Sequence, residues 1–527
     1  MKFPRLTRLL PDWKNAALAI LSAILLILAF PDFEFWFLAW VALVPLLWAI
    51  EREKESLVRS FVLGWLFGFV FFTGTCWWLT FAPITYAGFP WALAYSLLLC
   101  VTATVGIFPG LFAAILSFSL RRFGNIGIVA APFIWISSEL LRYWLTGNNW
   151  NAIGYSQALV GILNNWVPIG GTLLASFLLV AFNTALAFPL SVLIKADIDA
   201  KKLAVAITIP TGLCVLLFWT SPYPRWVISD STSDPGFARV VAIQPNVPMS
   251  GLNQEKWQQL RQRHVQLAES ALATINDHRS TSTTVIFPES PMNFMWEEDM
   301  EFQKFLRGFA AKNNVQVLFN SAEPDGQNNK YFNSAVLVGP DGREKAQYDK
   351  IYLLPFGESV PAPLQSIVPA FVGSFSYGKE YDLLPIGEAK AGVMICFESH
   401  FGELSREYVR NGADVIIEMT NDGYLGPTPV LRQHLANAVF RAVETSRPVI
   451  RATNVGITAY INERGEVLDA AEQYTEATRV WQVAKSDGSQ TLYVRYGDWF
   501  AWLCSVVTIV VMIIGLRRRS RRSVPPA

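Results

Sequence analysis

Three residues with complementary chemistry stand beside apolar runs in the middle of this chain: a carboxylate, an amine and a thiol. Glu289 follows the run VIFP, Lys350 precedes IYLLPFG, and Cys396 follows GVMI. Such runs predict buried strands, so the three side chains are expected at strand ends. A thiolate attacks a carbonyl carbon, a carboxylate takes the thiol proton as general base, and an ammonium stabilises the oxyanion. The set therefore predicts nucleophilic catalysis by Cys396.

Each of the three residues also has a structural interpretation. Taken alone, Cys396 fits a small buried side chain, Glu289 a charge near a helix N-terminus, and Lys350 a solvated strand position. A Cys–His pair is the main catalytic rival, but every histidine fits a solvated or capping position. The histidines are His264, His278, His400 and His434. The sequence contains no GxSxG motif, which disfavours a serine hydrolase.

The composition excludes several classes of protein. Of the 527 residues, 52% are hydrophobic and 16% are charged, which is too apolar for an ordinary soluble protein. A formal net charge of +1 argues against a nucleic-acid partner, because phosphate binding needs a concentrated basic face. The cysteines lack metal-type spacing, so we expect no metal, no cofactor and no disulfide framework. The other four cysteines all lie in apolar segments: Cys76, Cys100, Cys214 and Cys504.

Apolar segments at both ends of the chain predict an α-helical membrane bundle of about eight spans, since a bilayer core of about 30 Å needs about 20 helical residues. The candidate spans are residues 16–30, 35–50, 57–80, 91–120, 126–145, 169–194, 203–220 and 499–516. The first two are short, so a re-entrant pair is an alternative. The first span also resembles a signal peptide, but it has no small-x-small cleavage site and is expected to be retained.

The positions of lysine and arginine predict the orientation of the spans. With a cytoplasmic N-terminus, the inner segments carry Arg52, Lys54, Arg59, Arg121, Arg122, Lys195, Lys201, Lys202, Arg517, Arg518, Arg519, Arg521 and Arg522. The outer connections 31–34, 81–90 and 146–168 carry none, in line with the positive-inside rule. We therefore expect both termini in the cytoplasm and three regions. These are a seven-span bundle (residues 1–220), an outer catalytic domain (221–498), and an eighth span with a basic tail (499–527).

Two charged residues fall within the apolar segments, near the outer end of the fifth candidate span. Glu139 and Arg142 are three positions apart and share one helix face. They predict either a structural ion pair or a contact to a lipid head group.

Residues 221–498 read as a layered α/β domain, because short apolar runs alternate with polar helical stretches. The expected strands are residues 240–244, 284–287, 315–320, 334–338, 391–395, 415–419, 449–453, 457–461 and 467–470. The expected helices are residues 254–275, 302–313, 403–411 and 431–445.

The outer domain resembles the nitrilase (carbon-nitrogen hydrolase) superfamily. Its Glu-Lys-Cys triad matches Glu289 in FPES, Lys350 in YDKIYLLPFGE and Cys396 in ICFES. Together with the bundle, the whole chain resembles the apolipoprotein N-acyltransferase family of bacterial inner membranes. The resemblance implies an αββα sandwich in the periplasm. It also implies acyl transfer from a phospholipid, typically phosphatidylethanolamine, through a cysteine thioester to the α-amine of a lipoprotein's diacylglyceryl-cysteine.

The resemblance also implies roles for further residues. Glu358 in PFGE matches the family's second essential glutamate, and Glu398 in CFE matches the acid that follows the cysteine. Phe397 stands where many members have tyrosine, and its N–H is a candidate oxyanion donor. Trp257 in EKW matches a functional tryptophan, and Asn333 in YFNSA is expected to shape the site. Both substrates are lipids, so segments 291–296 and 368–377 are candidate membrane-facing lids, with ordinary loop packing as the alternative.

Two other functions are compatible with parts of the sequence. A membrane-tethered amidase acting on a small water-soluble amide would keep the triad and use the spans only as an anchor. A transporter or assembly scaffold would carry an inactive outer domain. The scarcity of intramembrane charges and the intact triad disfavour the scaffold.

Overall fold

The structure is a computed structural model, which describes residues 9–193, 212, 238–275, 282–289, 294–355, 357–360 and 375–518. The chain forms two compact units. The first contains Met1–Tyr223, Thr428–Gln433 and Asp498–Ala527, and the second contains Pro224–Pro427 and His434–Gly497.

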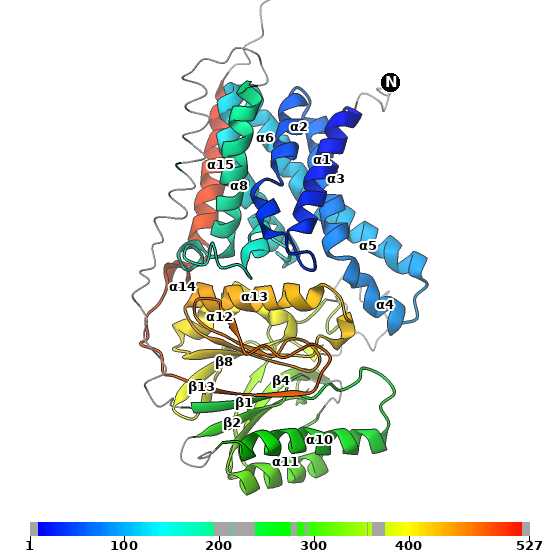
Figure 1. The fold of residues 1–527 in the computed structure, drawn as a ribbon, viewed down its shortest axis with the longest axis vertical. Helices are drawn as coiled ribbons and strands as arrows, with labels where there is room; N and C mark the ends of the chain where they lie inside the picture. Colours follow the sequence, from blue (N-terminus) through cyan, green and yellow to red (C-terminus); the bar gives the residue numbers. More distant parts are fainter. Residues whose placement is uncertain are drawn as a thin grey trace, which may run out of the picture. The chain divides into compact units, whose positions relative to one another are not determined.

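The first unit is helical (Figure 1). Its helices are α1 (Trp13–Leu28), α2 (Val44–Arg52), α3 (Leu57–Thr75), α4 (Phe81–Thr85), α5 (Trp91–Val105), α6 (Ile107–Phe123), α7 (Ala131–Thr146), α8 (Val167–Leu193) and α15 (Trp499–Arg517). Within the described residues, four helical stretches are long and apolar enough to cross a membrane: Leu57–Thr75, Trp91–Thr146, Val167–Phe188 and Trp499–Arg517. The 56-residue stretch contains α5, α6 and α7. This composition is that of a membrane protein.

Several predicted spans differ from the observed helices. Residues 35–50 do not form one helix, because the 3₁₀ helix η2 (Trp36–Trp40) precedes α2, which has proline in its first turn. Residues 91–120 divide at Gly106 into α5 and α6. An added Cβ at Gly106 would lie 3.1 Å from the backbone oxygen of Trp65, so α3 passes close to this break. Predicted span 203–220 lies outside the described residues except for Gly212.

The second unit contains two β-sheets. The first has the order β13 (Ala477–Val483), β1 (Ala238–Gln244), β2 (Thr283–Ile286), β3 (Gln316–Asp325), β4 (Lys330–Val338), β5 (Glu344–Asp349), with β6 (Phe375–Ser376) paired to β4. The second has the order β12 (Val467–Leu468), β11 (Ala459–Ile461), β10 (Val449–Thr453), β9 (Val415–Thr420), β8 (Ala389–Ile395), β7 (Leu383–Ile386). The central strands are parallel in each sheet: β1, β2 and β3 in one, and β8, β9 and β10 in the other.

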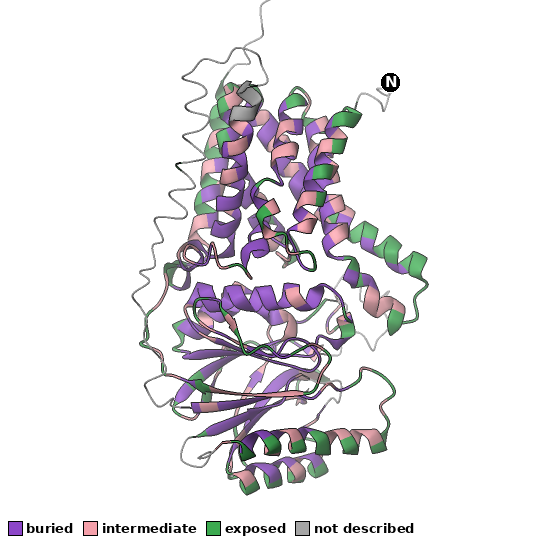
Figure 2. Ribbon diagram, viewed as in Figure 1, coloured by how far each residue is buried: buried purple, intermediate pink, exposed green. Residues whose placement is uncertain are grey.

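Helices cover the outer faces of both sheets, which gives four layers (Figure 1). Helices α10 (Gln254–Ala273) and α11 (Met300–Asn313) lie on the first sheet, and α12 (Gly402–Arg410) and α13 (Val430–Thr445) lie on the second. Strands β2, β9 and β10 are buried at every residue (Figure 2). Burial on both faces explains why these strands are mainly uncharged, although β9 carries Glu418 and β10 carries Arg451. The predicted α/β layered domain is confirmed.

Candidate active site

The cysteine sits on a tight turn at the end of a buried strand. Strand β8 ends at Ile395, and the 3₁₀ helix η7 (Cys396–His400) begins immediately after it. Cys396 has a φ of +52°, a left-handed conformation that costs a non-glycine residue about 1–3 kcal/mol. The backbone on both sides of the turn is held by hydrogen bonds. Ile395 N donates to Glu398 (2.9 Å), and His434 Nε2 lies 3.0 Å from the carbonyl oxygen of Cys396.

The lysine follows β5 and is buried, with 1% of its side chain exposed. Its Nζ lies 2.8 Å from Glu358 Oε1 and 4.0 Å from Glu289 Oε1. Burial alone would lower the pKa of Lys350, but the two carboxylates outweigh it and raise the pKa above its ordinary value. Lys350 is therefore a fixed cation in this site.

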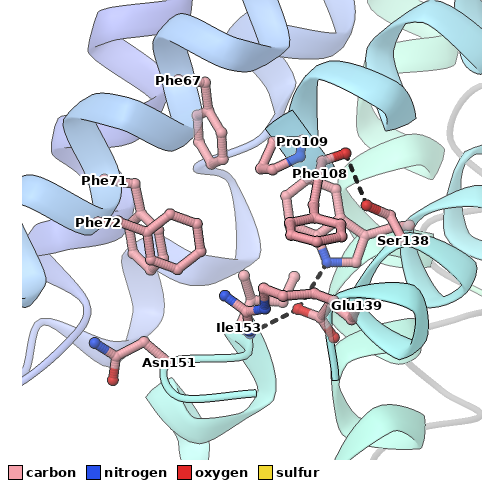
Figure 3. A pocket seen from close by; sticks show the side chains of 11 residues that line it. Phe67, Phe71, Phe72, Phe108, Pro109, Ser138, Glu139, Asn151 and Ile153 are labelled. Carbon is pink, nitrogen blue, oxygen red and sulfur yellow. Dashed lines mark hydrogen bonds between the residues drawn. The ribbon is translucent and has the colours of Figure 1, made fainter. Parts of the chain in front are cut away.

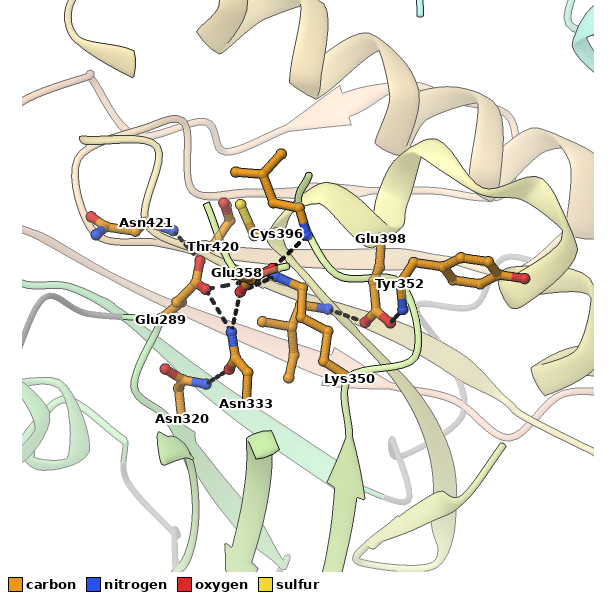
Figure 4. Close-up of polar contacts among 12 residues, drawn as sticks. Glu289, Asn320, Asn333, Lys350, Tyr352, Glu358, Cys396, Glu398, Thr420 and Asn421 are labelled. Atoms are coloured by element: carbon orange, nitrogen blue, oxygen red, sulfur yellow. Dashed lines mark hydrogen bonds and ion pairs between the residues drawn. The ribbon is translucent and has the colours of Figure 1, made fainter. Parts of the chain in front are cut away.

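The carboxylate of Glu289 follows β2 and faces the lysine and the thiol (Figure 4). It accepts hydrogen bonds from Asn421 N (3.2 Å) and Asn333 Nδ2 (3.3 Å). Burial raises the pKa of Glu289, while Lys350 acts in the opposite direction. Burial and the nearby Glu289 charge raise the pKa of the Cys396 thiol well above its ordinary value, again opposed by Lys350. The structure thus brings Glu289, Lys350 and Cys396 together.

Two further predicted residues complete the polar cluster around the lysine. Glu358 Oε1 accepts from Lys350 Nζ and from Asn333 Nδ2 (2.7 Å), and its Oε2 accepts from Leu354 N (2.7 Å). Asn333 lies on β4 and bridges Glu289 and Glu358 through its amide nitrogen. Its own carbonyl oxygen accepts from Asn320 Nδ2 (2.6 Å), which fixes the orientation of the amide. These contacts place Glu358 and Asn333 beside Glu289 and Lys350.

Glu398 is fully buried and connects the backbone segments that carry the lysine and the cysteine. Its Oε1 accepts from the N–H groups of Ile351 (2.7 Å) and Tyr352 (3.0 Å), directly after Lys350. Its Oε2 accepts from Ile395 N, directly before the cysteine. Burial raises the pKa of Glu398 to about 7, although Lys350 and these hydrogen bonds oppose the shift. Glu398 therefore links the segment after Lys350 to the turn at Cys396.

Trp257 and Phe397 are placed differently from the polar residues. Trp257 lies on α10 and packs against the apolar cluster between α10, α11 and the first sheet. Phe397 stacks on His400 (ring centroids 5.8 Å apart) and meets Phe401 edge-on (5.3 Å). Among the contacts described for the triad side chains, none involves the ring of either residue.

The expectation of a solvated position is wrong for the three histidines that the structure describes. His264, His400 and His434 are each at most 4% exposed. The fourth, His278, lies outside the described residues. The ring of His264 lies edge-on to Phe287 and its Nδ1 is 2.7 Å from the Leu260 oxygen. His264 on α10 and His434 on α13 are buried because both helices turn these positions toward the interior.

Sequence reasoning also missed an ionic cluster behind the cysteine. Its members are Glu418, Asp422, His434 and Arg451, all at most 3% exposed. Asn421 and Asp422 follow β9 as the cysteine follows β8, and Asn421 N donates to Glu289. Polar residues at the end of a strand parallel and adjacent to β8 were the available signal.

The candidate lid segments are described only in part. Residues 291–293 and 368–374 lie outside the described residues. At the end of the first segment, Phe294 and Trp296 are each 4% exposed and belong to the apolar core cluster. For these two side chains ordinary packing is the observed arrangement. In the second segment, Phe375 and Ser376 form β6.

In the first unit, Glu139 and Arg142 line a pocket together with aromatic rings (Figure 3). Glu139 Oε1 accepts from Trp135 Nε1 (2.9 Å) and Ile153 N (3.1 Å). Arg142 donates to Asn149 (2.7 Å). Each charged side chain is thus held by neutral partners. Within the described residues, no group of three or more His, Cys, Asp or Glu side chains is arranged to hold a metal ion.

Comparison with known proteins gives consistent relatives over the whole chain. The family profile of the apolipoprotein N-acyltransferase N-terminal domain matches residues 22–185, and that of carbon-nitrogen hydrolase matches residues 240–492. The apolipoprotein N-acyltransferase of Geobacter metallireducens is 31% identical over 96% of each chain. This chain belongs to the apolipoprotein N-acyltransferase family. The apolipoprotein N-acyltransferase of Pasteurella multocida is 28% identical, again over 96% of each chain.

The family resemblance inferred from the sequence motifs is therefore confirmed, and the second unit has the carbon-nitrogen hydrolase fold. Among solved structures, the chain is similar to Nit3 of Saccharomyces cerevisiae, a member of the nitrilase superfamily, at 18% identity and a TM-score of 0.36. That similarity covers 47% of this chain and 90% of Nit3. In this chain the residues that match the carbon-nitrogen hydrolase profile follow those that match the N-terminal domain profile.

Proposed function

We propose that this enzyme acylates lipoproteins through a thioester on Cys396. Membership of the apolipoprotein N-acyltransferase family makes it an acyltransferase of lipoprotein maturation with a membrane-lipid donor. The donor we propose is phosphatidylethanolamine, cleaved at its sn-1 ester, and the acceptor is the α-amine of the N-terminal diacylglyceryl-cysteine. The observation that supports this route is the cluster of Glu289 and Lys350 around the Cys396 thiol.

The first half-reaction forms the thioester. Glu289 takes the thiol proton, and the thiolate attacks the ester carbonyl carbon. Lys350 Nζ and the N–H of Phe397 stabilise the resulting oxyanion. When the tetrahedral intermediate collapses, the carbon–oxygen bond of the ester breaks. Protonated Glu289 returns its proton to the departing alkoxide, so that the lysophospholipid leaves as a neutral alcohol.

The second half-reaction uses the same groups. The free α-amine attacks the thioester carbonyl, Glu289 takes the amine proton, and the carbon–sulfur bond breaks to release the N-acylated product. The departing sulfur regains its proton from Glu289. The pKa shifts suit this cycle, because a thiol with a raised pKa stays protonated until a base acts on it. Likewise, a glutamate with a raised pKa is a better proton acceptor near neutral pH.

We further propose roles for the supporting residues. Glu358 and Asn333 hold Lys350 and Glu289 in register through the bonds described above. Glu398 fixes the cysteine turn to the segment after Lys350. Trp257 and Phe397 are both partly exposed, and we propose that they contribute to substrate binding.

The membrane arrangement we propose has about eight spans in a bacterial inner membrane. Residues 1–220 form seven spans, residues 221–498 form a periplasmic catalytic domain, and residues 499–527 form the eighth span and a basic tail. Both termini are then cytoplasmic. The distribution of lysine and arginine supports this orientation, since the connections assigned to the outside contain neither residue.

Mass spectrometry of the purified enzyme after incubation with phosphatidylethanolamine tests the proposal. One acyl adduct on Cys396 is expected, sensitive to hydroxylamine, and Cys396→Ala should carry none. A hydroxylamine-sensitive adduct that persists on Cys396→Ala would place the nucleophile elsewhere. Release of ammonia from small amides without any lipid adduct would instead support an amidase.

A further inference from the structure

The ionic cluster behind Cys396 has contacts that fix the protonation state of His434. His434 Nδ1 lies 2.7 Å from Asp422 Oδ1, and Nε2 lies 3.0 Å from both the Cys396 carbonyl oxygen and Glu418 Oε1. Each of these partners is an oxygen acceptor, so both ring nitrogens must carry hydrogen and the imidazole is a cation. The His434 pKa of about 9 agrees with a cation. Burial lowers this pKa, but the carboxylates of Asp422 and Glu418 outweigh burial and raise it above the ordinary value.

The cluster is balanced in charge. Arg451 NH1 lies 2.7 Å from Glu418 Oε2, and its NH2 lies 2.6 Å from Asp422 Oδ2. Two carboxylates therefore face two cations, and the four side chains come from β9, the turn after it, α13 and β10. A buried, neutral and mutually bonded cluster of this kind holds its members in one geometry, because breaking any pair leaves an uncompensated buried charge.

The bond from His434 determines which way one peptide group points. The Cys396–Phe397 peptide is trans, because the only cis bond in the described chain precedes Asp32. In a trans peptide the C=O and the N–H point in opposite directions. When His434 Nε2 holds the Cys396 carbonyl on the side of the cluster, the Phe397 N–H must point to the other side. Rotation of this peptide would turn the carbonyl toward the position that the N–H otherwise occupies.

We propose that His434 is a positioning residue for acyl transfer: its cationic ring holds the Cys396–Phe397 peptide so that the Phe397 N–H serves the oxyanion. The proposal rests on the proposed thioester route. It gives the left-handed backbone at Cys396 a function, since this conformation brings the carbonyl to His434. His434 makes no contact with substrate in this scheme and acts only through the peptide.

A matched pair of double variants separates this role from charge balance. Both carry Glu418→Gln, which keeps the cluster neutral once the histidine charge is removed. One adds His434→Gln, whose amide nitrogen can take the place of Nε2 and donate to the Cys396 carbonyl. The other adds His434→Leu, which has similar bulk and no donor. Single-turnover acyl-enzyme formation from phosphatidylethanolamine is measured for each, with His264→Leu as a control for the loss of a buried histidine elsewhere.

Alkylation of Cys396 by iodoacetamide, followed by peptide mapping, is the second measurement. Alkylation displaces iodide from a saturated carbon and forms no oxyanion, so it needs the thiolate but not the Phe397 N–H. We expect the double variant with His434→Leu to form acyl-enzyme at least about 100-fold more slowly than the one with His434→Gln, because removal of one oxyanion donor usually costs about that factor in rate. Their alkylation rates should differ by less than about threefold, and His264→Leu should acylate like the wild type.

Equal rates of acyl-enzyme formation in the two double variants would overturn the proposal. A parallel loss of acylation and alkylation in the double variant with His434→Leu would also overturn the proposal, since that result means that His434 only maintains the fold. The test is distinct from that of the thioester route. If the wild type forms no acyl adduct, the thioester route itself fails. If the wild type is acylated and the two double variants are acylated at the same rate, only the role of His434 is removed.

Discussion

The buried carboxyl group of Glu398 offers a quantitative test of how the site is braced. Its two oxygens accept four hydrogen bonds and face no acceptor: Oε1 accepts from Tyr348 OH (2.7 Å), Ile351 N and Tyr352 N, and Oε2 accepts from Ile395 N. In Glu398→Gln the amide can present its oxygen to three donors, but its NH₂ then faces the N–H of Ile395. One buried donor is left without an acceptor, at a cost of about 1–3 kcal/mol.

The pH dependence of this loss follows from the pKa of Glu398. Its value of about 7 is raised by burial above the ordinary value of 4.5. A carboxyl group whose pKa is raised in the folded state adds stability below the unfolded pKa and loses it as the pH rises through the folded pKa. Between pH 5 and pH 8 the wild type should thus lose about 2.5 kcal/mol that Glu398→Gln does not lose. The deficit of Glu398→Gln is therefore largest at pH 5 and shrinks toward pH 8.

Thermal unfolding of the purified enzymes at pH 5 and pH 8 measures this change. For a domain of about 250 residues, a change of about 2.5 kcal/mol in the free energy of unfolding corresponds to about 5–10 °C in Tm. Glu301→Gln, on an exposed position of α11, is the matched control and should keep a constant offset from the wild type. A Glu398→Gln offset that is equal at both pH values, or larger at pH 8, would refute the assignment of a raised pKa to Glu398.

Two further outcomes concern the catalytic residues. Lys350→Ala leaves Glu289 and Glu358, which are only 15% and 12% exposed, without their cation. It should cost about 3 kcal/mol in stability and abolish the acyl adduct. Unfolding curves and mass spectrometry measure both, and a stable, acylated variant would contradict the role of Lys350. Because burial and Glu289 raise the pKa of the Cys396 thiol well above its usual range, its alkylation rate should still climb about tenfold per pH unit beyond pH 9. A plateau near pH 8.5 would show an ordinary thiol.

The sequence predicted the strands that are buried on both faces better than the others. β8, β9 and β10 are mainly apolar, with one charged residue each, because helices and the facing sheet cover both sides. β5 and β13 were missed, since they are partly exposed and rich in charged or polar residues. Their pairing with β4 and β1 depends on partners that local patterning does not reveal.

The predicted spans 57–80, 91–120, 126–145, 169–194 and 499–516 overlap the four helical stretches that are long and apolar enough to cross a membrane, but their ends differ. Hydropathy does not distinguish one long helix from two joined at Gly106, where the break depends on the close passage of α3. The 3₁₀ segment Trp36–Trp40 is as apolar as a helix, so its composition carried no signal. Both errors arise where the backbone geometry is set by tertiary contacts.

At the site, Glu289 and Cys396 were predicted because each follows an apolar run that forms a strand, β2 in the first sheet and β8 in the second. Three of the four members of the ionic cluster, by contrast, lie where sequence gives little warning: Glu418 within β9, Arg451 within β10, and His434 on α13. An isolated charge within a buried strand normally argues against the strand itself. Only the three-dimensional pairing of Glu418 with Arg451 makes these positions tolerable.

The two charge clusters near the cysteine differ in net charge, and the difference matches their proposed tasks. Glu418 and Asp422 face two cations, His434 and Arg451, so that cluster is neutral and suited to a fixed geometry. Glu289 and Glu358 share the single cation Lys350, so their cluster has a net negative charge when both are ionised. An excess carboxylate favours uptake of one proton, which is what a group that accepts and returns a proton in each half-reaction requires.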